Sequence, residues 1–233
     1  MFERPHHQRI ARVLDSLDAP WLAQHGCLFG GGTAIALSHG EYRESVDVDF
    51  LVSASEGYRA LRERVRSAAG IVALGRPGHL LRQAREVRVD QYGIRTFVIV
   101  DDELIKFEIV REARIELSPP VDGDRICGVA RLTTVDLATS KLLALADRWA
   151  DDSVHSRDLI DLAMMNLPRR TLQQAKAKAG RAYSSIERDL VMAIEALHRR
   201  PGRLEACATA LQMTTPLALL TKRIKRLPER ARA

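Results

Sequence analysis

Hydrophobic and polar residues follow two different periods along the chain, and the change comes near residue 131. In the front part, apolar residues recur at helical spacing in residues 7–24 and 56–68, and a short helix is expected after the glycines at 30–32. Runs rich in β-branched and aromatic residues predict strands at 46–52, 94–100 and 104–110, with a hairpin turn at 101–103. A further strand is expected near 125–131.

From Thr133 onward the pattern is helical. Residues 133–152 begin with an N-cap candidate and place Leu137, Leu142 and Leu145 on one side of a helix. Four more helical segments follow: RDLIDLAMMN, TLQQAKAKAGRAY, IERDLVMAIEALHRR and PLALLTKRIKRL. The sequence therefore predicts an α+β domain of residues 1–131, with a sheet and flanking helices, and a C-terminal helical bundle of residues 132–233.

Composition excludes several protein classes. Of the 233 residues, 46% are hydrophobic and 28% charged, which is typical of globular chains and not of disordered or fibrous ones. No apolar run approaches the roughly 18 residues that a membrane helix needs. The N-terminus lacks the apolar core of an export signal, and the three cysteines form no CxxC pair. We therefore expect a cytoplasmic protein without a membrane partner.

The net charge of +6 is concentrated at the C-terminus. Residues 221–233 hold six basic residues and one acidic residue, which leaves only +1 for the first 220 residues. Leu219, Leu220, Ile224 and Leu227 are interleaved with these cations and predict an amphipathic basic helix. Such a helix is typical either of a solvated terminus or of a contact with an RNA backbone.

A glycine turn, Phe29-Gly30-Gly31-Gly32-Thr33, precedes the first short helix. Glycines allow the backbone to approach phosphate closely, and the amides at a helix start attract anions. Thr33 adds a hydroxyl donor. Taken alone, the turn is more often a plain connection, and no GK[ST] follows that would make it a P-loop.

Carboxylates on two predicted strands form the second candidate site. Asp47 and Asp49, two residues apart in SVDVDF, project to one face, while Val46, Val48 and Phe50 are expected to face the core. Oxygen ligands suit Mg²⁺ completed by substrate phosphates, with Mn²⁺ as a second choice. If the strand of Glu108 lies next to that of Asp49, Glu108 becomes a third acid, able to bind a metal or accept a proton. Solvated strand faces are the alternative for all three.

These motifs together resemble the polymerase-β-like nucleotidyltransferases. GGGTAIAL followed by R-x-S-x-D-x-D-F is similar to the abortive-infection nucleotidyltransferase toxins of the AbiE type, as is the later TTVDLATSKLLALADRW…RDLIDL. The resemblance spans roughly residues 24–165. It implies a polymerase-β-like core with a mixed sheet. The third acid in such transferases is usually Asp, so Glu108 departs from the pattern and puts full activity in question.

The resemblance also implies a role for each matching residue. Lys141 would reach the triphosphate, Asp158 matches the acid of the second helical motif, and Asp161 is interpreted as structural. The implied catalytic residues are Asp47, Asp49, Glu108, Lys141 and Asp158, and the implied metal ligands are Asp47, Asp49 and Glu108. The implied nucleotide-binding residues are Gly31, Gly32, Thr33, Arg43, Ser45 and Lys141.

The expected function is a Mg²⁺-dependent transfer of a nucleoside monophosphate from a nucleoside triphosphate to an acceptor. By resemblance to the family, tRNA leads the acceptors, and the protein would be the toxin of a toxin–antitoxin pair. Two other hypotheses stay open from the sequence: a small-molecule nucleotidyltransferase, and a non-catalytic module that binds a nucleotide or an antitoxin.

Overall fold

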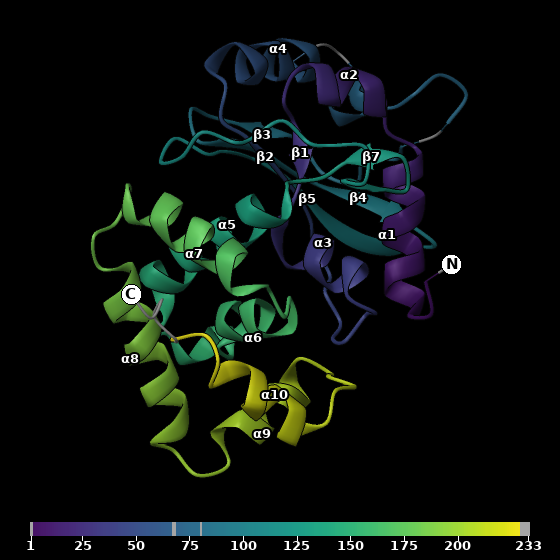
Figure 1. Cartoon of the computed structure of the whole chain (residues 1–233). Coiled ribbons are helices and arrows are strands. Elements are labelled where there is room, and N and C mark those ends of the chain that lie inside the picture. Colours follow the sequence, from purple (N-terminus) through teal and green to yellow (C-terminus); the bar gives the residue numbers. More distant parts are fainter. Residues whose placement is uncertain (1, 67–68, 80, 229–233) are drawn as a thin grey trace. The chain divides into compact units, whose positions relative to one another are not determined.

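The protein is described by a computed structural model that covers residues 2–66, 69–79 and 81–228. The chain divides into two compact units (Figure 1). Unit 1 comprises Met1–Ser38 and Ser45–Thr133, and unit 2 comprises His39–Glu44 and Thr134–Ala233. Residues 229–233 of the predicted basic tail lie outside the described residues.

Unit 1 is built on a five-stranded mixed sheet in the order β1-β2-β5-β4-β3. The strands are β1 (Leu28–Phe29), β2 (Val48–Val52), β3 (Arg88–Val89), β4 (Gly93–Val100) and β5 (Glu103–Arg111). β2 and β5 run parallel, and the other pairs are antiparallel. β6 (Arg125–Ile126) and β7 (Val129–Ala130) form a separate short hairpin, which confirms the strand structure predicted near 125–131. The α+β class is confirmed.

Helices surround this sheet: α1 (Pro5–Asp15), α2 (Ala19–Gln24), α3 (Gly31–Ser38), α4 (Ser55–Val65) and a 3₁₀ turn at Gly70–Leu74. The single helical run expected at 7–24 is two helices. Asp18 accepts a hydrogen bond from the Trp21 amide at 3.2 Å, and Pro20 stands in the first turn of α2, so the chain restarts there.

The core of unit 1 follows the alternation of its strands. Phe29, Phe50 and Phe107 are fully buried, with ring centroids 5.5 and 5.6 Å apart along the row. The expected hairpin between β4 and β5 is confirmed, and Asp101 and Asp102 form its turn with φ of 50° and 60°. Val46 was expected in the core and is instead 50% exposed, because β2 begins only at Val48.

Unit 2 is helical from Thr134 onward, with α5 in contact with α6, α7 and α8. Its elements are α5 (Thr134–Arg148), a 3₁₀ turn (Asp152–Val154), α6 (Arg157–Met164), α7 (Arg169–Gly180), α8 (Ile186–His198), α9 (Arg203–Ala210) and α10 (Leu217–Ile224). The pattern did not predict α9, in which Cys207 is the one buried residue. The segment 39–44 joins this unit through hydrogen bonds from Glu44 N to Leu211 O and from Thr214 N to Tyr42 O.

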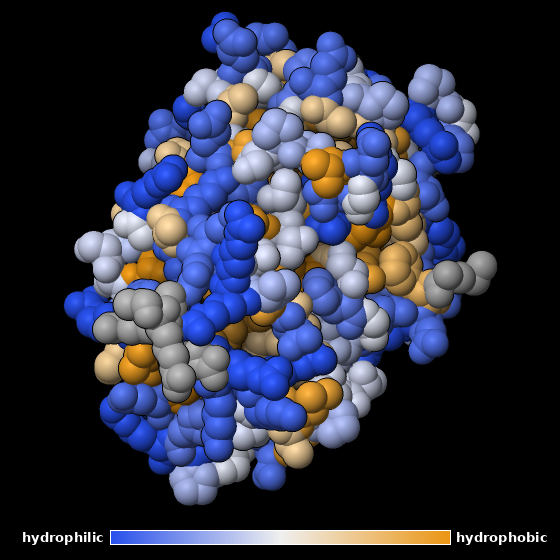
Figure 2. All heavy atoms as spheres, viewed as in Figure 1, coloured by the Kyte–Doolittle hydropathy of each residue, from blue (hydrophilic) through white to orange (hydrophobic). Residues whose placement is uncertain are grey.

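The surface shows no extended apolar area on the face in view. Hydrophobic side chains there form small patches separated by hydrophilic ones (Figure 2). Among the described helices, none combines the length and apolarity needed to cross a membrane.

Candidate functional site

The glycine turn of unit 1 is shaped around Asp49. The Gly30 amide donates to the Asp49 carbonyl at 2.8 Å. Gly31 has φ +67°, and a Cβ placed on it would lie 2.3 Å from Asp49 Oδ2. Glycine is therefore required at position 31 both by the backbone and by the neighbouring carboxylate. α3 begins at Gly31, so the first-turn amides that include Gly32 have no partner within the helix.

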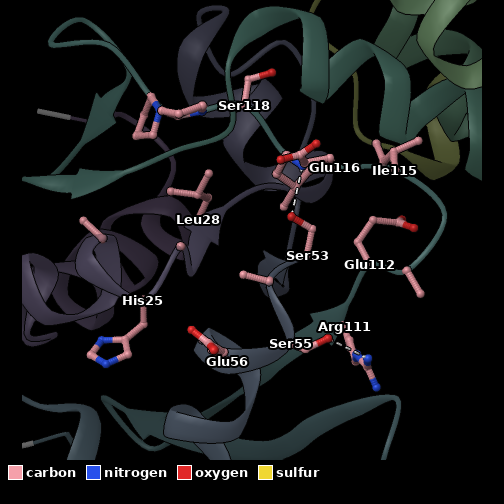
Figure 3. A pocket seen from close by; sticks show the side chains of 18 of the residues that line it. His25, Leu28, Ser53, Ser55, Glu56, Arg111, Glu112, Ile115, Glu116 and Ser118 are labelled. Atoms are coloured by element: carbon pink, nitrogen blue, oxygen red, sulfur yellow. Dashed lines mark hydrogen bonds between the residues drawn. The ribbon is translucent and has the colours of Figure 1, made fainter.

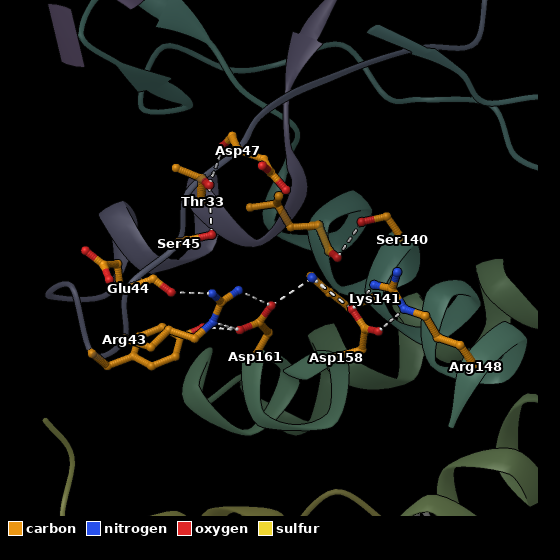
Figure 4. Close-up of polar contacts among 12 residues, drawn as sticks. Thr33, Arg43, Glu44, Ser45, Asp47, Ser140, Lys141, Arg148, Asp158 and Asp161 are labelled. Carbon is orange, nitrogen blue, oxygen red and sulfur yellow. Dashed lines mark hydrogen bonds and ion pairs between the residues drawn. The ribbon is translucent and has the colours of Figure 1, made fainter. Parts of the chain in front are cut away.

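Thr33 holds the segment that leads into β2. Its buried hydroxyl donates to the Asp47 carbonyl at 2.5 Å and lies 2.8 Å from the Ser45 hydroxyl, which must then donate to it (Figure 4). The sequence analysis expected Thr33 and Ser45 to serve the nucleotide. The structure places both side chains inside unit 1, where they fix the backbone just before Asp49.

Two histidines that the sequence analysis did not select anchor the same segment. The Ser45 amide donates to His7 Nε2 at 3.1 Å, and His6 donates to the Val46 carbonyl at 3.0 Å. His7 is fully buried. One signal could have found it: His7 shares the apolar side of α1 with Ile10 and Leu14, where a polar side chain needs a partner.

Glu108 lies beside Asp49 in the sheet, because the two residues are register partners in the parallel β2–β5 pair. The condition set for Glu108 as a third acid, that its strand lies next to that of Asp49, is met. The Glu108 carboxylate, 15% exposed, meets Lys106 Nζ at 2.6 Å and Arg95 Nε at 3.2 Å. Across residues 2–66, 69–79 and 81–228, no group of three or more His, Cys, Asp or Glu side chains is arranged to hold a metal ion. The Glu108 carboxylate is therefore paired with two cations of its own sheet face.

A buried ion cluster in unit 2 gathers the other predicted residues. Arg43 binds Asp161 with two hydrogen bonds, 2.7 Å from Nε and 2.9 Å from Nη2. Lys141 Nζ lies 2.7 Å from Asp161 and 2.9 Å from Asp158. Arg148 adds two bonds to Asp158 at 2.7 and 2.9 Å. Figure 4 shows Asp161 between Arg43 and Lys141.

The charges of this cluster perturb one another strongly. Burial alone would raise the pKa of Asp161, but Arg43 and Lys141 outweigh it and hold that pKa below its ordinary value. Burial likewise opposes the charge of Lys141, yet Asp161 and Asp158 keep its pKa raised. Three cations face two carboxylates, so the cluster carries one net positive charge. Arg148 is its most exposed cation, with 34% of its side chain accessible.

The buried ion cluster therefore brings Arg43, Lys141 and Asp158 into one ion-pair network. It also includes Asp161, interpreted from the sequence as structural, whose carboxylate contacts both Arg43 and Lys141. Tyr42, which the sequence analysis did not select, donates its hydroxyl to Asp161 at 2.5 Å.

A separate cavity of unit 1 lies at the other end of β2. It has a volume of about 990 Å³ and is lined by segments 23–28, 53–60 and 111–120. Figure 3 shows Ser53 and Ser55 at its wall, and Arg111 donates to Ser55 at 3.1 Å. None of the predicted site residues lines it, because Asp47 precedes β2 and this cavity follows its end.

Comparisons with known proteins agree with the motifs. No curated protein matches the chain. Two solved structures, both from Helicobacter pylori, are similar to the chain at 15% sequence identity. A candidate nucleotidyltransferase has a TM-score of 0.49, and the match covers 96% of this chain and 93% of that one. JHP933 has a TM-score of 0.47, and the match covers 97% of this chain and 95% of that one. A family model described as nucleotidyl transferase AbiEii toxin, type IV toxin–antitoxin system, matches residues 13–224. The chain therefore belongs to the AbiEii family of nucleotidyltransferase toxins.

Proposed function

We propose that this nucleotidyltransferase moves a nucleoside monophosphate from a nucleoside triphosphate to the end of an RNA, with tRNA as the leading acceptor. The observation that carries the proposal is the Gly31–Asp49 arrangement. The first turn of α3 begins at Gly31, next to the Asp49 carboxylate, and there is no room for a side chain between them. Phosphate and a divalent cation need these two features side by side.

The donor set of this site fits Mg²⁺, with Mn²⁺ as an alternative. Asp47 and Asp49 offer only oxygen, which hard divalent cations prefer, and two carboxylates leave coordination places for substrate phosphates and water. When bound, such an ion neutralises charge that develops on the phosphates. His6 and His7 of α1 and Thr33 of α3 bond to the backbone of residues 45–47, so the segment that carries the two carboxylates is fixed by both helices.

The reaction requires a base beside the acceptor. The acceptor hydroxyl oxygen forms a bond to the α-phosphorus while the bond to the bridging oxygen breaks and pyrophosphate leaves. The hydroxyl proton must then be accepted, and Glu108, the register partner of Asp49, is our assignment for that role. Its contacts with Lys106 and Arg95 keep its carboxylate oriented.

The family resemblance assigns residues of the buried ion cluster to the nucleotide. The buried ion cluster keeps one net positive charge, and Lys141 is held by two carboxylates in one geometry. Asp158 positions both Lys141 and Arg148, and Asp161 does the same for Arg43 and Lys141. We assign Lys141 and Arg43 to charge compensation of the nucleotide, Asp158 to the placement of Lys141, and Asp161 to the placement of both. An antitoxin encoded with the protein, and a cytoplasmic setting, complete the proposal.

Transfer of label from each α-labelled nucleoside triphosphate, with Mg²⁺ and total RNA, tests this function. We expect one RNA class to be labelled by the wild-type protein and none by Asp47→Asn or Asp49→Asn. Asp102→Asn is the matched control, because Asp102 lies in the β4–β5 turn at φ 60°, a conformation that Asn tolerates. Label on a small molecule in place of RNA would refute the RNA acceptor. Undiminished transfer by both site variants would refute the carboxylate assignment.

A further inference from the structure

The sheet face that carries Asp49 and Glu108 continues outward as a basic surface. On β5, Ile105, Phe107 and Ile109 are buried, so the alternate residues Lys106 and Glu108 lie on the opposite face. Register places Arg95 of β4 beside Glu108 and Arg88 of β3 beside Arg95. Residues directly opposite on neighbouring strands share a face, so Asp49, Glu108, Arg95 and Arg88 form one row across the sheet.

A second row runs next to the first. Lys106 is the register partner of Phe97, and the Arg85 guanidinium lies over the Phe97 ring at 4.3 Å. The segment before β3 follows β4 closely, with hydrogen bonds from Ala84 N to Phe97 O and from Ile99 N to Arg82 O. Arg85 is therefore held on the face of Lys106. We call Arg85, Arg88, Arg95, Lys106 and Phe97 the basic sheet face.

The charge of this face is local and positive. Arg85 and Arg88 are exposed, and the side chains of Arg95 and Lys106 are 38% and 41% exposed. The acids nearby, Glu108 and Asp90, each meet Arg95, and Glu108 also meets Lys106. Arg88 lies on the edge strand β3, two strand spacings from β5, so its backbone stands about 10 Å from that of Glu108 at ordinary strand spacing.

We propose that the basic sheet face binds the single-stranded end of a nucleic-acid acceptor. The inference rests on the proposed function, because it places the terminal nucleotide at Glu108. The preceding nucleotides then cross β4 and β3, with phosphates at Arg88, Arg95 and Lys106. A base stacks against the Arg85–Phe97 pair, since guanidinium and aromatic planes hold bases without regard to sequence. A small-molecule acceptor held at Glu108 would not reach cations two strands away.

Direct binding of RNA tests this surface independently of transfer. The probe is a short fluorescent single-stranded RNA with a free 3′ end, titrated with the full chain. The variant is Arg85→Glu with Arg88→Glu, and the matched control is Arg59→Glu with Arg66→Glu, two exposed arginines at α4 and its end. Both pairs change the net charge equally, and neither touches the carboxylates. Binding of a fluorescent nucleoside triphosphate reports separately on the nucleotide site.

We expect Arg85→Glu/Arg88→Glu to weaken RNA binding by tenfold or more and to leave nucleotide binding unchanged, while the control binds RNA as the wild type does. The variant loses one phosphate contact, at Arg88, which lowers the salt slope by about 0.7, so wild-type affinity should fall about 2.6-fold further than that of the variant between about 50 and 200 mM salt. Equal binding by the two double variants, or no RNA binding by the wild type, would overturn the proposal. Intact RNA binding without transfer would count against the proposed function and not against the surface.

Discussion

Replacing Asp161 with Asn tests whether the buried ion cluster organises unit 2. The Asp161 carboxylate is fully buried and accepts hydrogen bonds from Tyr42, Arg43 and Lys141. Asn keeps the size of the side chain but removes its charge. The Arg43 side chain, only 5% accessible, would then lose the carboxylate with which it is paired. Lys141 would retain Asp158.

The expected cost follows from that loss. Removing one partner of a buried ion pair costs about 3–5 kcal/mol, since the remaining charge stays desolvated without compensation. At a slope of about 2 kcal/mol per M urea, the unfolding midpoint of unit 2 should fall by about 2 M. The effect should depend on pH. The pKa of Asp161 is depressed in the folded protein, so its stabilisation is complete above the unfolded value of about 3.9 and is lost progressively as the pH falls from there toward the depressed folded pKa.

The chain offers a separate probe for each unit. Trp149 lies in unit 2 and Trp21 in unit 1, so the fluorescence of a Trp21→Phe protein follows unit 2 alone. Urea unfolding of this protein with and without Asp161→Asn, at pH 7 and near pH 3, measures the loss and its pH dependence. Glu205→Gln, at an exposed position of α9 in the same unit, is the control for a lost charge and should leave the midpoint in place.

A midpoint shift below about 0.5 M would refute this reasoning, because a loss of about 1 kcal/mol is the size of an ordinary neutral hydrogen bond. An equal loss at both pH values would also refute it, since the stabilisation would then not come from the ionised carboxylate.

Two further substitutions test the carboxylate site. Gly31→Ala should lower the free energy of unfolding by about 1–3 kcal/mol, because φ is +67° there, and should abolish transfer, because the new Cβ would clash with Asp49. Gly26→Ala is the control: its φ of +62° imposes the same strain, but no atom lies within 4 Å of the new Cβ, so transfer should be kept. Thr33→Val keeps the shape of the side chain but removes its hydrogen bond to the Asp47 carbonyl. Thermal unfolding should therefore show a loss of stability of about 1–3 kcal/mol, and kcat should fall. Thr33→Ser keeps the hydroxyl and should retain both the stability and kcat. Transfer unaffected by Gly31→Ala or by Thr33→Val would contradict the positioning roles.

The fold was predictable wherever local pattern and tertiary packing agree. Period-two alternation predicts β4 and β5 because one side of each strand is buried and the other is not. Extending that alternation back to Val46 failed, because hydrogen bonds to His6 and Thr33 shape the residues before Val48 into a loop. The sequence pattern did not predict α9, because a helix with one buried residue shows no apolar stripe at helical spacing.

The sequence predicted the short motifs of the site but not the long-range contacts between its residues. Asp47, Asp49 and the glycine turn are close in sequence, so their chemistry is visible in a single segment. Ser45 and His7 are 38 positions apart, and Arg43 and Asp161 are 118 apart. No spacing rule reports pairs of that kind. Asp161 was therefore interpreted as structural, although three side chains converge on its carboxylate.

Net charge was the least informative quantity, because it sums residues that the fold separates. The first 220 residues total only +1, yet the basic sheet face places four cations beside the carboxylate site. The basic tail, in contrast, is largely part of unit 2: Leu220, Ile224 and Leu227 are buried, and the Leu227 carbonyl accepts a hydrogen bond from Lys176 at 2.9 Å. Removing the tail would therefore remove packing along with charge. Substituting Lys222 and Lys225, both exposed, separates the two effects, so a loss of RNA binding in that variant would identify α10 as a second contact in its own right.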